Sequence, residues 1–188
     1  MNYPFNIFNK RLLKAILFLP LLTPLLPFEI NQAKSLEFQW DRNSGYKSLR
    51  WYQTTAEKNF RNKLFLFFKP KDRRTGLLSI SLKIPKKYQK SLKQENISFC
   101  KAKIGAFSSK SKCIEKIPSD IVLNKETERL EIYPISPVPS DKNTYAVVFK
   151  LNNPQRSGMY QFHSFGKSSG PIPVSSYIGS WTVTIDPS

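Results

Sequence analysis

The stretch L-L-S-I-S-L-K-I-P, residues 77–85, alternates apolar and polar side chains along most of its length. Its even-numbered positions from 78 to 84 are Leu or Ile, and the positions between them are Ser, Ser and Lys. Successive side chains of a β-strand point to opposite faces of a sheet, so a period of two is typical of a strand with one face in a core. This stretch predicts such a strand and indicates a protein built from sheets.

Short runs of the same kind recur along the chain, and the connections between them are rich in Asn, Asp, Gly and Pro. The runs are residues 63–69, 95–104, 129–133, 144–152, 159–165 and 176–186. One face of the run 144–152 holds Tyr145, Val147, Phe149 and Leu151, and one face of the run 176–186 holds Tyr177, Gly179, Trp181, Val183 and Ile185. We therefore predict an all-β fold, a single-domain antiparallel β-sandwich of about seven to eight strands.

Two segments depart from this pattern. Residues 85–93 begin with a proline and offer only Tyr88 and Leu92 for burial, which predicts a surface helix of one or two turns. At most one or two such short helices are expected in the domain. Residues 40–60 show no clean periodicity, and we expect them to be irregular or weakly helical.

The first 35 residues form a segment of another kind. A basic stretch precedes an apolar run, residues 15–28, that three prolines interrupt. A helix that crosses a membrane tolerates such prolines poorly, because its backbone groups have to be satisfied internally. Small residues, Ala33 and Ser35, stand where a signal peptidase requires them. We predict a signal peptide over residues 1–35, and an uncleaved membrane anchor is the alternative.

Cleavage leaves residues 36–188 as a single exported domain, long enough for one core. Its only cysteines are Cys100 and Cys113. An exported chain meets an oxidising compartment, so this pair predicts a disulfide. Closing a loop of about 15 residues contributes about 3 kcal/mol in the chain-entropy model. Two thiols without companion histidines do not complete a zinc site, and we expect neither a metal nor a cofactor.

Positive charge is concentrated in the first half of this domain. Residues 36–116 contain 20 basic and 6 acidic residues, whereas residues 117–188 contain 6 of each. Such an excess attracts anionic surfaces and polymers, although a solvated lysine-rich surface without a ligand is the alternative reading. The candidate anion-binding residues form three groups: Lys69, Lys71, Arg73 and Arg74; Lys86, Lys87, Lys90 and Lys93; and Lys101, Lys103, Lys110 and Lys112.

Two segments near the C-terminus carry recognisable motifs. Residues 152–162 contain Asn-Asn-Pro followed by Gly-Met-Tyr-Gln-Phe, and residues 177–185 read Tyr-Ile-Gly-Ser-Trp-Thr-Val-Thr-Ile. They resemble the N-P-x-x-x-G-x-Y-x-F and Y-[IL]-G-x-W endings of an uncharacterised exported family found in cyanobacteria, a domain of unknown function. With the upstream segments, the resemblance covers nearly all of residues 45–186. It implies a small secreted or periplasmic protein and supplies no catalytic residues.

The residues of these motifs also suggest structural roles. Glycine tolerates backbone conformations and close contacts that other residues do not, so we expect Gly158 and Gly179 to permit a turn and a close approach or bulge. The aromatic positions are expected to pack inward; they are Tyr160, Phe162, Tyr177 and Trp181.

Few residues suggest catalysis. His163 is the only histidine, and no nucleophile motif surrounds it, so we expect it on an exposed or edge position of a strand. Glu126, Glu128 and Glu131 form the only acidic cluster, but basic residues interleave them, which favours a solvated hairpin tip over a glycosidase pair.

These observations favour a non-enzymatic envelope or periplasmic protein. We expect its basic half to meet an anionic envelope component, such as lipid headgroups or acidic polysaccharide, or an acidic protein. Export removes nucleic acid from the expected partners, and no integral membrane span is expected after cleavage. Two alternatives stay open: a hydrolase that acts on an envelope polymer, and a structural surface protein.

Overall fold

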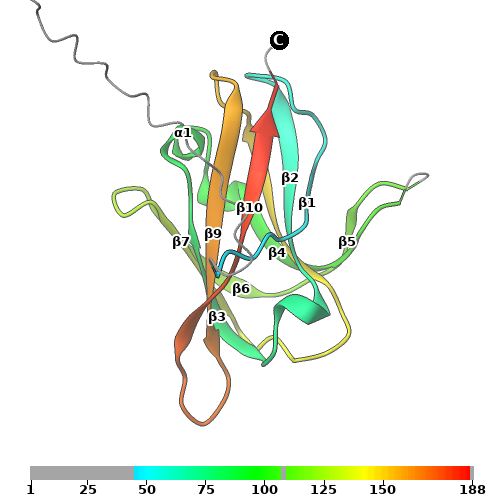
Figure 1. Ribbon diagram of the computed structural model, residues 1–188, viewed down its shortest axis with the longest axis vertical. Coiled ribbons are helices and arrows are strands. Elements are labelled where there is room, and N and C mark those ends of the chain that lie inside the picture. Colours follow the sequence, from blue (N-terminus) through cyan, green and yellow to red (C-terminus); the bar gives the residue numbers. More distant parts are fainter. Residues whose placement is uncertain (1–44, 107–108, 187–188) are drawn as a thin grey trace, which may run out of the picture. The chain divides into compact units, whose positions relative to one another are not determined.

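The computed structural model describes residues 45–106 and 109–186, and this part of the chain folds as two antiparallel five-stranded sheets (Figure 1). The first sheet has the order β1-β2-β8-β4-β5 and the second has the order β10-β9-β3-β7-β6. The strands are β1 (Trp51–Gln53), β2 (Arg61–Phe68), β3 (Leu77–Lys83), β4 (Ile97–Lys103), β5 (Lys112–Lys116), β6 (Ser119–Asn124), β7 (Arg129–Pro134), β8 (Tyr145–Asn152), β9 (Gly158–Ser168) and β10 (Ser175–Ile185). The prediction of an all-β sandwich is confirmed, with ten strands instead of seven to eight.

The three strands that the sequence pattern missed lie at sheet edges. β1 has three half-buried residues, and most side chains of β5 are exposed. β6 alternates half-buried and exposed residues, but none of its side chains is fully buried. An edge strand gains its order from hydrogen bonds to one neighbour, so its sequence need not show a strong apolar period. The expectation for residues 40–60 needs correction in its described part, because residues 45–60 contain β1 and no helix.

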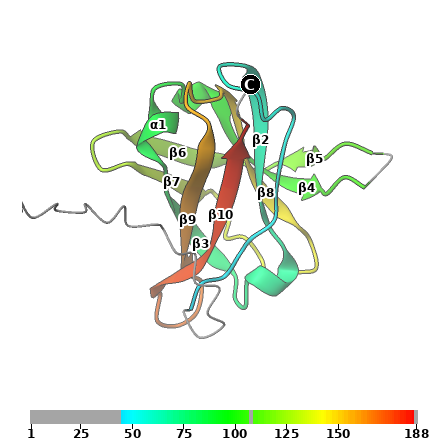
Figure 2. The same ribbon diagram turned by 45° about the horizontal axis from the view of Figure 1, so that its top comes forward.

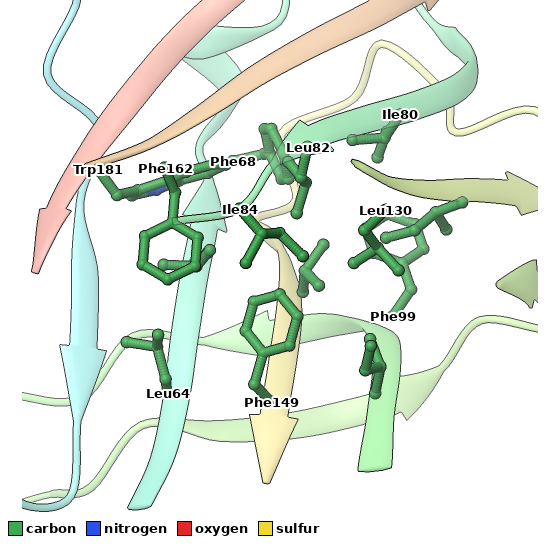
Figure 3. Close-up of a cluster of buried hydrophobic side chains, with 14 of the residues drawn as sticks. Leu64, Phe68, Ile80, Leu82, Ile84, Phe99, Leu130, Phe149, Phe162 and Trp181 are labelled. Carbon is green, nitrogen blue, oxygen red and sulfur yellow. The ribbon is translucent and has the colours of Figure 1, made fainter. Parts of the chain in front are cut away.

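The core lies between the two sheets. Figure 3 shows side chains of both sheets meeting there, among them Leu64, Phe99 and Phe149 from one sheet and Leu82, Leu130 and Phe162 from the other. All six are at most 1% exposed. The predicted inward face of β8 is confirmed, since Tyr145, Val147, Phe149 and Leu151 all belong to this cluster. Burial of each such side chain stabilises the fold by roughly 1.5 to 3 kcal/mol.

The first sheet also carries a second buried apolar cluster, formed by residues of the opposite parity. Phe65 and Phe67 of β2 stack at 5.9 Å between ring centroids, beside Val148 of β8. The cluster includes Cys100, which forms a disulfide with Cys113 and thereby ties β4 to β5. The predicted disulfide is confirmed.

A bulge in each of two strands shifts the predicted alternation. The pairing of β10 with β9 changes register between Tyr177 and Gly179, which turns Ile178 into the core. Tyr177 is instead 38% exposed and packs against Phe165, so its predicted inward position is wrong. A second bulge in β3 buries Leu77 and leaves Leu78 half-buried, the reverse of the strict period.

The predicted short helix is confirmed as α1 (Lys86–Gln89), which continues in a turn. Tyr88 and Leu92 are its fully buried apolar residues, as the sequence indicates. Two 3₁₀ turns, η1 (Pro70–Asp72) and η2 (Gln94–Asn96), complete the helical structure. Among the described residues, none of the helices has the length and apolar character that crossing a bilayer requires. The predicted signal peptide, residues 1–35, lies outside the described residues.

Candidate anion-binding site

The fold separates the three predicted basic groups from one another. The group of residues 86–93 lies on α1 and the turn after it, while the group of residues 101–112 lies on the hairpin of β4 and β5. These two elements stand on different sides of the sandwich in both views (Figures 1 and 2). The group of residues 69–74 lies around η1, at the end away from α1. The basic half of the sequence is therefore not one continuous surface.

Arg73 has to be removed from the candidates, because its side chain is structural. It is 5% exposed, and its guanidinium lies 4.6 Å from the ring of Tyr145. Nη1 donates to the Pro139 carbonyl at 2.6 Å, and Nη2 pairs with Asp141 at 3.3 Å. Burial acts to raise the pKa of Asp141, but hydrogen bonds, chiefly from Asn143 and Tyr145, hold that pKa below its ordinary value. Asp141 is therefore charged at neutral pH and compensates Arg73.

The strongest basic site is a hollow between α1 and the loop that joins β8 to β9. Its volume is about 370 Å³, and no Asp or Glu is among the described residues that line it. Lys87 and Lys90 come from the predicted group, and Arg156 adds a third cation that the sequence analysis missed. The remaining lining residues are Asn59, Ser91, Asn152, Asn153, Pro154 and Gln155.

The loop side of this hollow is held by the Asn-Asn-Pro motif. Asn153 is 3% exposed, and its Nδ2 donates to the carbonyl oxygens of Thr55 at 3.1 Å and Glu57 at 2.8 Å. Its Oδ1 accepts a hydrogen bond from Asn62 Nδ2 at 2.8 Å. Because the side chain uses both its donor and its acceptor groups, the chain just before Arg156 is fixed to the sandwich.

The helix side is held by Tyr88, which lies between Lys87 and the turn that carries Lys90. The Tyr88 ring packs edge-on against Tyr160 at 5.2 Å and Phe162 at 5.0 Å between centroids. Burial raises the pKa of the Tyr88 hydroxyl far above its ordinary value, so the group stays neutral. Tyr88 therefore anchors the helix to the core. The side chains of Lys87 and Lys90 are exposed and line the hollow.

The only histidine belongs to a different polar cluster, on the outer face of β9 and β10. His163 Nδ1 lies 2.8 Å from Ser180 Oγ, and the Tyr177 hydroxyl lies 2.6 Å from the same oxygen. Ser180 is completely buried, because residues 47–49 pair with it through two backbone hydrogen bonds of 2.8 Å. His163 is half-buried and lies on β9, which is flanked by β10 and β3, so the expected exposed or edge-strand position is wrong.

We predict that protonation of His163 destabilises the domain. Desolvation, together with the positive charge of Lys83, holds its pKa below the ordinary value of about 6.5. When the pH falls through about 6.5, the unfolded chain takes up this proton before the folded chain does. The free energy of unfolding therefore decreases until the pH has passed the lower pKa of the folded chain. Urea unfolding between pH 7.5 and 5 should show this loss, and the difference curve against His163→Gln isolates it from the carboxylates. A flat difference curve contradicts the prediction.

Two residues of the acidic cluster, Glu126 and Glu128, lie in a hairpin turn as predicted, and Glu131 lies on β7. Residues 125–128 connect β6 to β7, and Glu128 adopts the left-handed φ of 59° that such a turn uses. Lys86 pairs with Glu128 at 3.8 Å, whereas the Glu131 carboxylate accepts a hydrogen bond of 2.6 Å from Ser81. Within the described residues, no group of three His, Cys, Asp or Glu side chains has the arrangement of a metal site.

The second motif holds the start of the described chain against β10. Gly179 has a φ of 155°, and a Cβ there would stand 2.7 Å from both the Leu49 side chain and the Lys47 carbonyl oxygen. The close approach therefore requires glycine, as expected. Trp181 Nε1 donates to the Arg50 carbonyl at 3.1 Å and the Phe67 carbonyl at 3.3 Å. Both motifs thus fasten residues 47–57, the stretch with no periodicity of its own.

Comparison with family models places residues 38–185 in a single family, described as a protein of unknown function, DUF2808. The chain belongs to DUF2808. This confirms the prediction of an uncharacterised domain family, and the match covers nearly all of residues 45–186, the range of the resemblance. Comparison with curated proteins returned no match.

Solved structures show distant likenesses to this DUF2808 domain. BslA, a bacterial hydrophobin, is 11% identical, with 75% of this chain and 95% of that chain covered and a TM-score of 0.48. The collagen-binding domain of a Staphylococcus aureus adhesin is 13% identical, with 73% and 97% covered and a TM-score of 0.39. The collagen-binding subdomain of the Enterococcus faecalis surface protein ACE is 11% identical, with 71% and 95% covered and a TM-score of 0.40. These values describe a distant resemblance among β domains. They do not bear on what this chain binds.

Proposed function

We propose that this DUF2808 domain is a non-enzymatic, exported protein of the cell envelope or periplasm that binds an acidic polysaccharide. The observation that carries the proposal is the hollow whose described lining contains Lys87, Lys90 and Arg156 and no carboxylate. Carboxylate and sulfate groups are strongly attracted to such a set, because lysine provides a mobile point charge and arginine a planar pair of donors. The exposed amide side chains of Asn152 and Gln155 add neutral hydrogen-bonding groups of the kind that sugars use.

Two features support export. The N-terminal 35 residues have the order of a signal peptide: a basic stretch, an apolar run and small residues. Cys100 and Cys113 are joined in a disulfide, and such bonds persist mainly in oxidising compartments outside the cytosol.

The arrangement of the polar groups favours a binding protein over a hydrolase. Ser180 is the hydroxyl beside His163, but it is completely buried and is not available to a substrate. Glu128 and Glu131 are engaged by Lys86 and Ser81. A purely structural surface protein remains the alternative, and it predicts no dependence on the three cations of the hollow.

The test compares two triple variants that remove the same charge from different places. Lys87→Gln/Lys90→Gln/Arg156→Gln should weaken binding to a soluble polyuronate by about threefold to 150-fold, since an exposed ion pair contributes roughly 0.2 to 1 kcal/mol and three are removed. Lys101→Gln/Lys103→Gln/Lys112→Gln, on the hairpin of β4 and β5, is the matched control and should retain most of the affinity. Isothermal calorimetry at low salt measures both.

Equal losses in the two variants would mean that only net charge matters, which contradicts a specific site. Retained affinity in the first variant, or no binding by the unmodified protein, also contradicts the proposal. Circular dichroism checks that each variant is folded.

A further inference from the structure

The loop between β9 and β10 presents apolar side chains to solvent. Ile172 is 78% exposed and Val174 is 57% exposed, and Pro171 and Pro173 alternate with them. The prolines fix φ at two positions, and the loop is closed by a hydrogen bond from Ser168 N to the Val174 carbonyl at 3.2 Å. In Figure 1 this loop extends past the neighbouring loops at the lower end of the sandwich. Two large apolar groups are thus held out on a restrained tip.

Cations lie on the segments that adjoin this tip. Ser169 N donates to the Gly76 carbonyl at 2.9 Å, so the tip lies beside the loop that contains Arg74. Lys167 lies on the adjoining end of β9, and Lys71 lies on η1 just before the Arg74 loop. The side chains of all three cations are exposed.

Two acidic residues of the neighbouring loops are paired with cations. Asp72 is buried and pairs with Lys47 at 3.4 Å, while Asp141 pairs with Arg73 at 3.3 Å. The exposed charges on the segments next to the apolar tip, Lys71, Arg74 and Lys167, are therefore left free for an anionic partner.

We propose that the β9–β10 loop inserts Ile172 and Val174 into the surface of an anionic lipid bilayer, with Lys71, Arg74 and Lys167 at the headgroups. Exposed apolar side chains favour the boundary between headgroups and acyl chains, and nearby cations are attracted to anionic lipids. An acidic polysaccharide would satisfy the cations but would leave the apolar tip in water. The combination on one loop therefore favours a bilayer.

This inference does not depend on the polysaccharide site, because the two lie at opposite ends of β9. Arg156 precedes the strand and Ile172 follows it, and 11 strand residues span roughly 35 Å. A domain seated on lipid through its tip would keep the hollow beside α1 free for a polymer.

The experiment uses the exported protein after its N-terminus has been determined. It measures the binding of this protein to phosphatidylcholine vesicles with and without phosphatidylglycerol. Ile172→Ser/Val174→Ser should bind the anionic vesicles at least about tenfold more weakly than the unmodified protein. Met159→Ser is the matched control, because Met159 is 64% exposed at the far end of β9, and it should bind normally. Loss of Lys71, Arg74 or Lys167 should weaken binding by about fivefold each.

A second variant reports insertion directly. The added tryptophan of Ile172→Trp should be quenched by brominated acyl chains, beyond any change in the unmodified protein. The proposal is overturned if the double serine variant binds vesicles normally, if the added tryptophan is not quenched, or if the unmodified protein does not distinguish the two vesicle types.

The polysaccharide proposal fails separately. The Lys87, Lys90 and Arg156 variant should keep its vesicle binding, and the Ile172 and Val174 variant should keep its polyuronate binding. If the serine variant instead loses polyuronate and keeps vesicles, the tip contacts the polymer and the bilayer proposal is wrong.

Discussion

Replacing Trp181 with alanine should lower the free energy of unfolding by about 3 to 5 kcal/mol. The indole is completely buried and meets Phe68 edge-on at 5.1 Å between ring centroids. Its removal leaves a cavity between the sheets and also takes one hydrogen-bond donor from the carbonyls of Arg50 and Phe67. Urea unfolding followed by circular dichroism measures the change.

Trp181→Phe separates packing from hydrogen bonding. Phenylalanine keeps an aromatic ring in the core but lacks the N–H group, so this variant should lose less stability than alanine. The chain at Arg50 should also become more accessible, and limited trypsin digestion reports cleavage there. An alanine variant as stable as the unmodified protein would contradict the role given to Trp181.

The second large effect is expected at the disulfide. Cys100→Ala/Cys113→Ala should lower the free energy of unfolding by about 3 kcal/mol, because the unfolded chain regains the freedom that the closed loop denied it. Alanine is preferred to serine here, since Cys100 is 1% exposed among apolar side chains and a buried hydroxyl would add its own cost. Urea unfolding of the oxidised protein and the variant gives the difference.

Reduction of the unmodified protein is the matched control. A reductant should lower its unfolding midpoint toward that of the double variant and leave the variant itself unchanged. A variant as stable as the oxidised protein, or a midpoint insensitive to reduction, would show that the bridge contributes nothing to stability.

Much of the fold could be predicted because neighbouring residues carry the signal. The alternation along β8 places Val147 and Phe149 in the core, and the proline before α1 begins a helix that buries Tyr88 and Leu92. Burial of one face leaves a period in the sequence and burial of both faces leaves a continuous apolar run, as in β2, so strands at the centre of a sheet are readable. β1 and β5 lie at sheet edges and leave no such period.

The candidate site could be predicted only in part. Lys87 and Lys90 were recognised from local charge, whereas Arg156 was not, because 66 residues separate it from Lys90 in a half of the domain without net charge. Arg73 looked like the exposed cations beside it, but its partner Asp141 lies in a distant loop. Charge density along a sequence cannot distinguish a buried, paired arginine from a free one.

Local sequence patterns predict a β-sandwich with one disulfide and one short helix, since alternation, paired cysteines and turn residues act over short distances along the chain. Tertiary structure alone decided the rest: that a bulge exposes Tyr177, that Gly179 admits Leu49, and that three cations meet at one hollow. Those outcomes depend on which strands pair and in what register. Pairing is set by contacts between residues far apart in the chain, which no local pattern records.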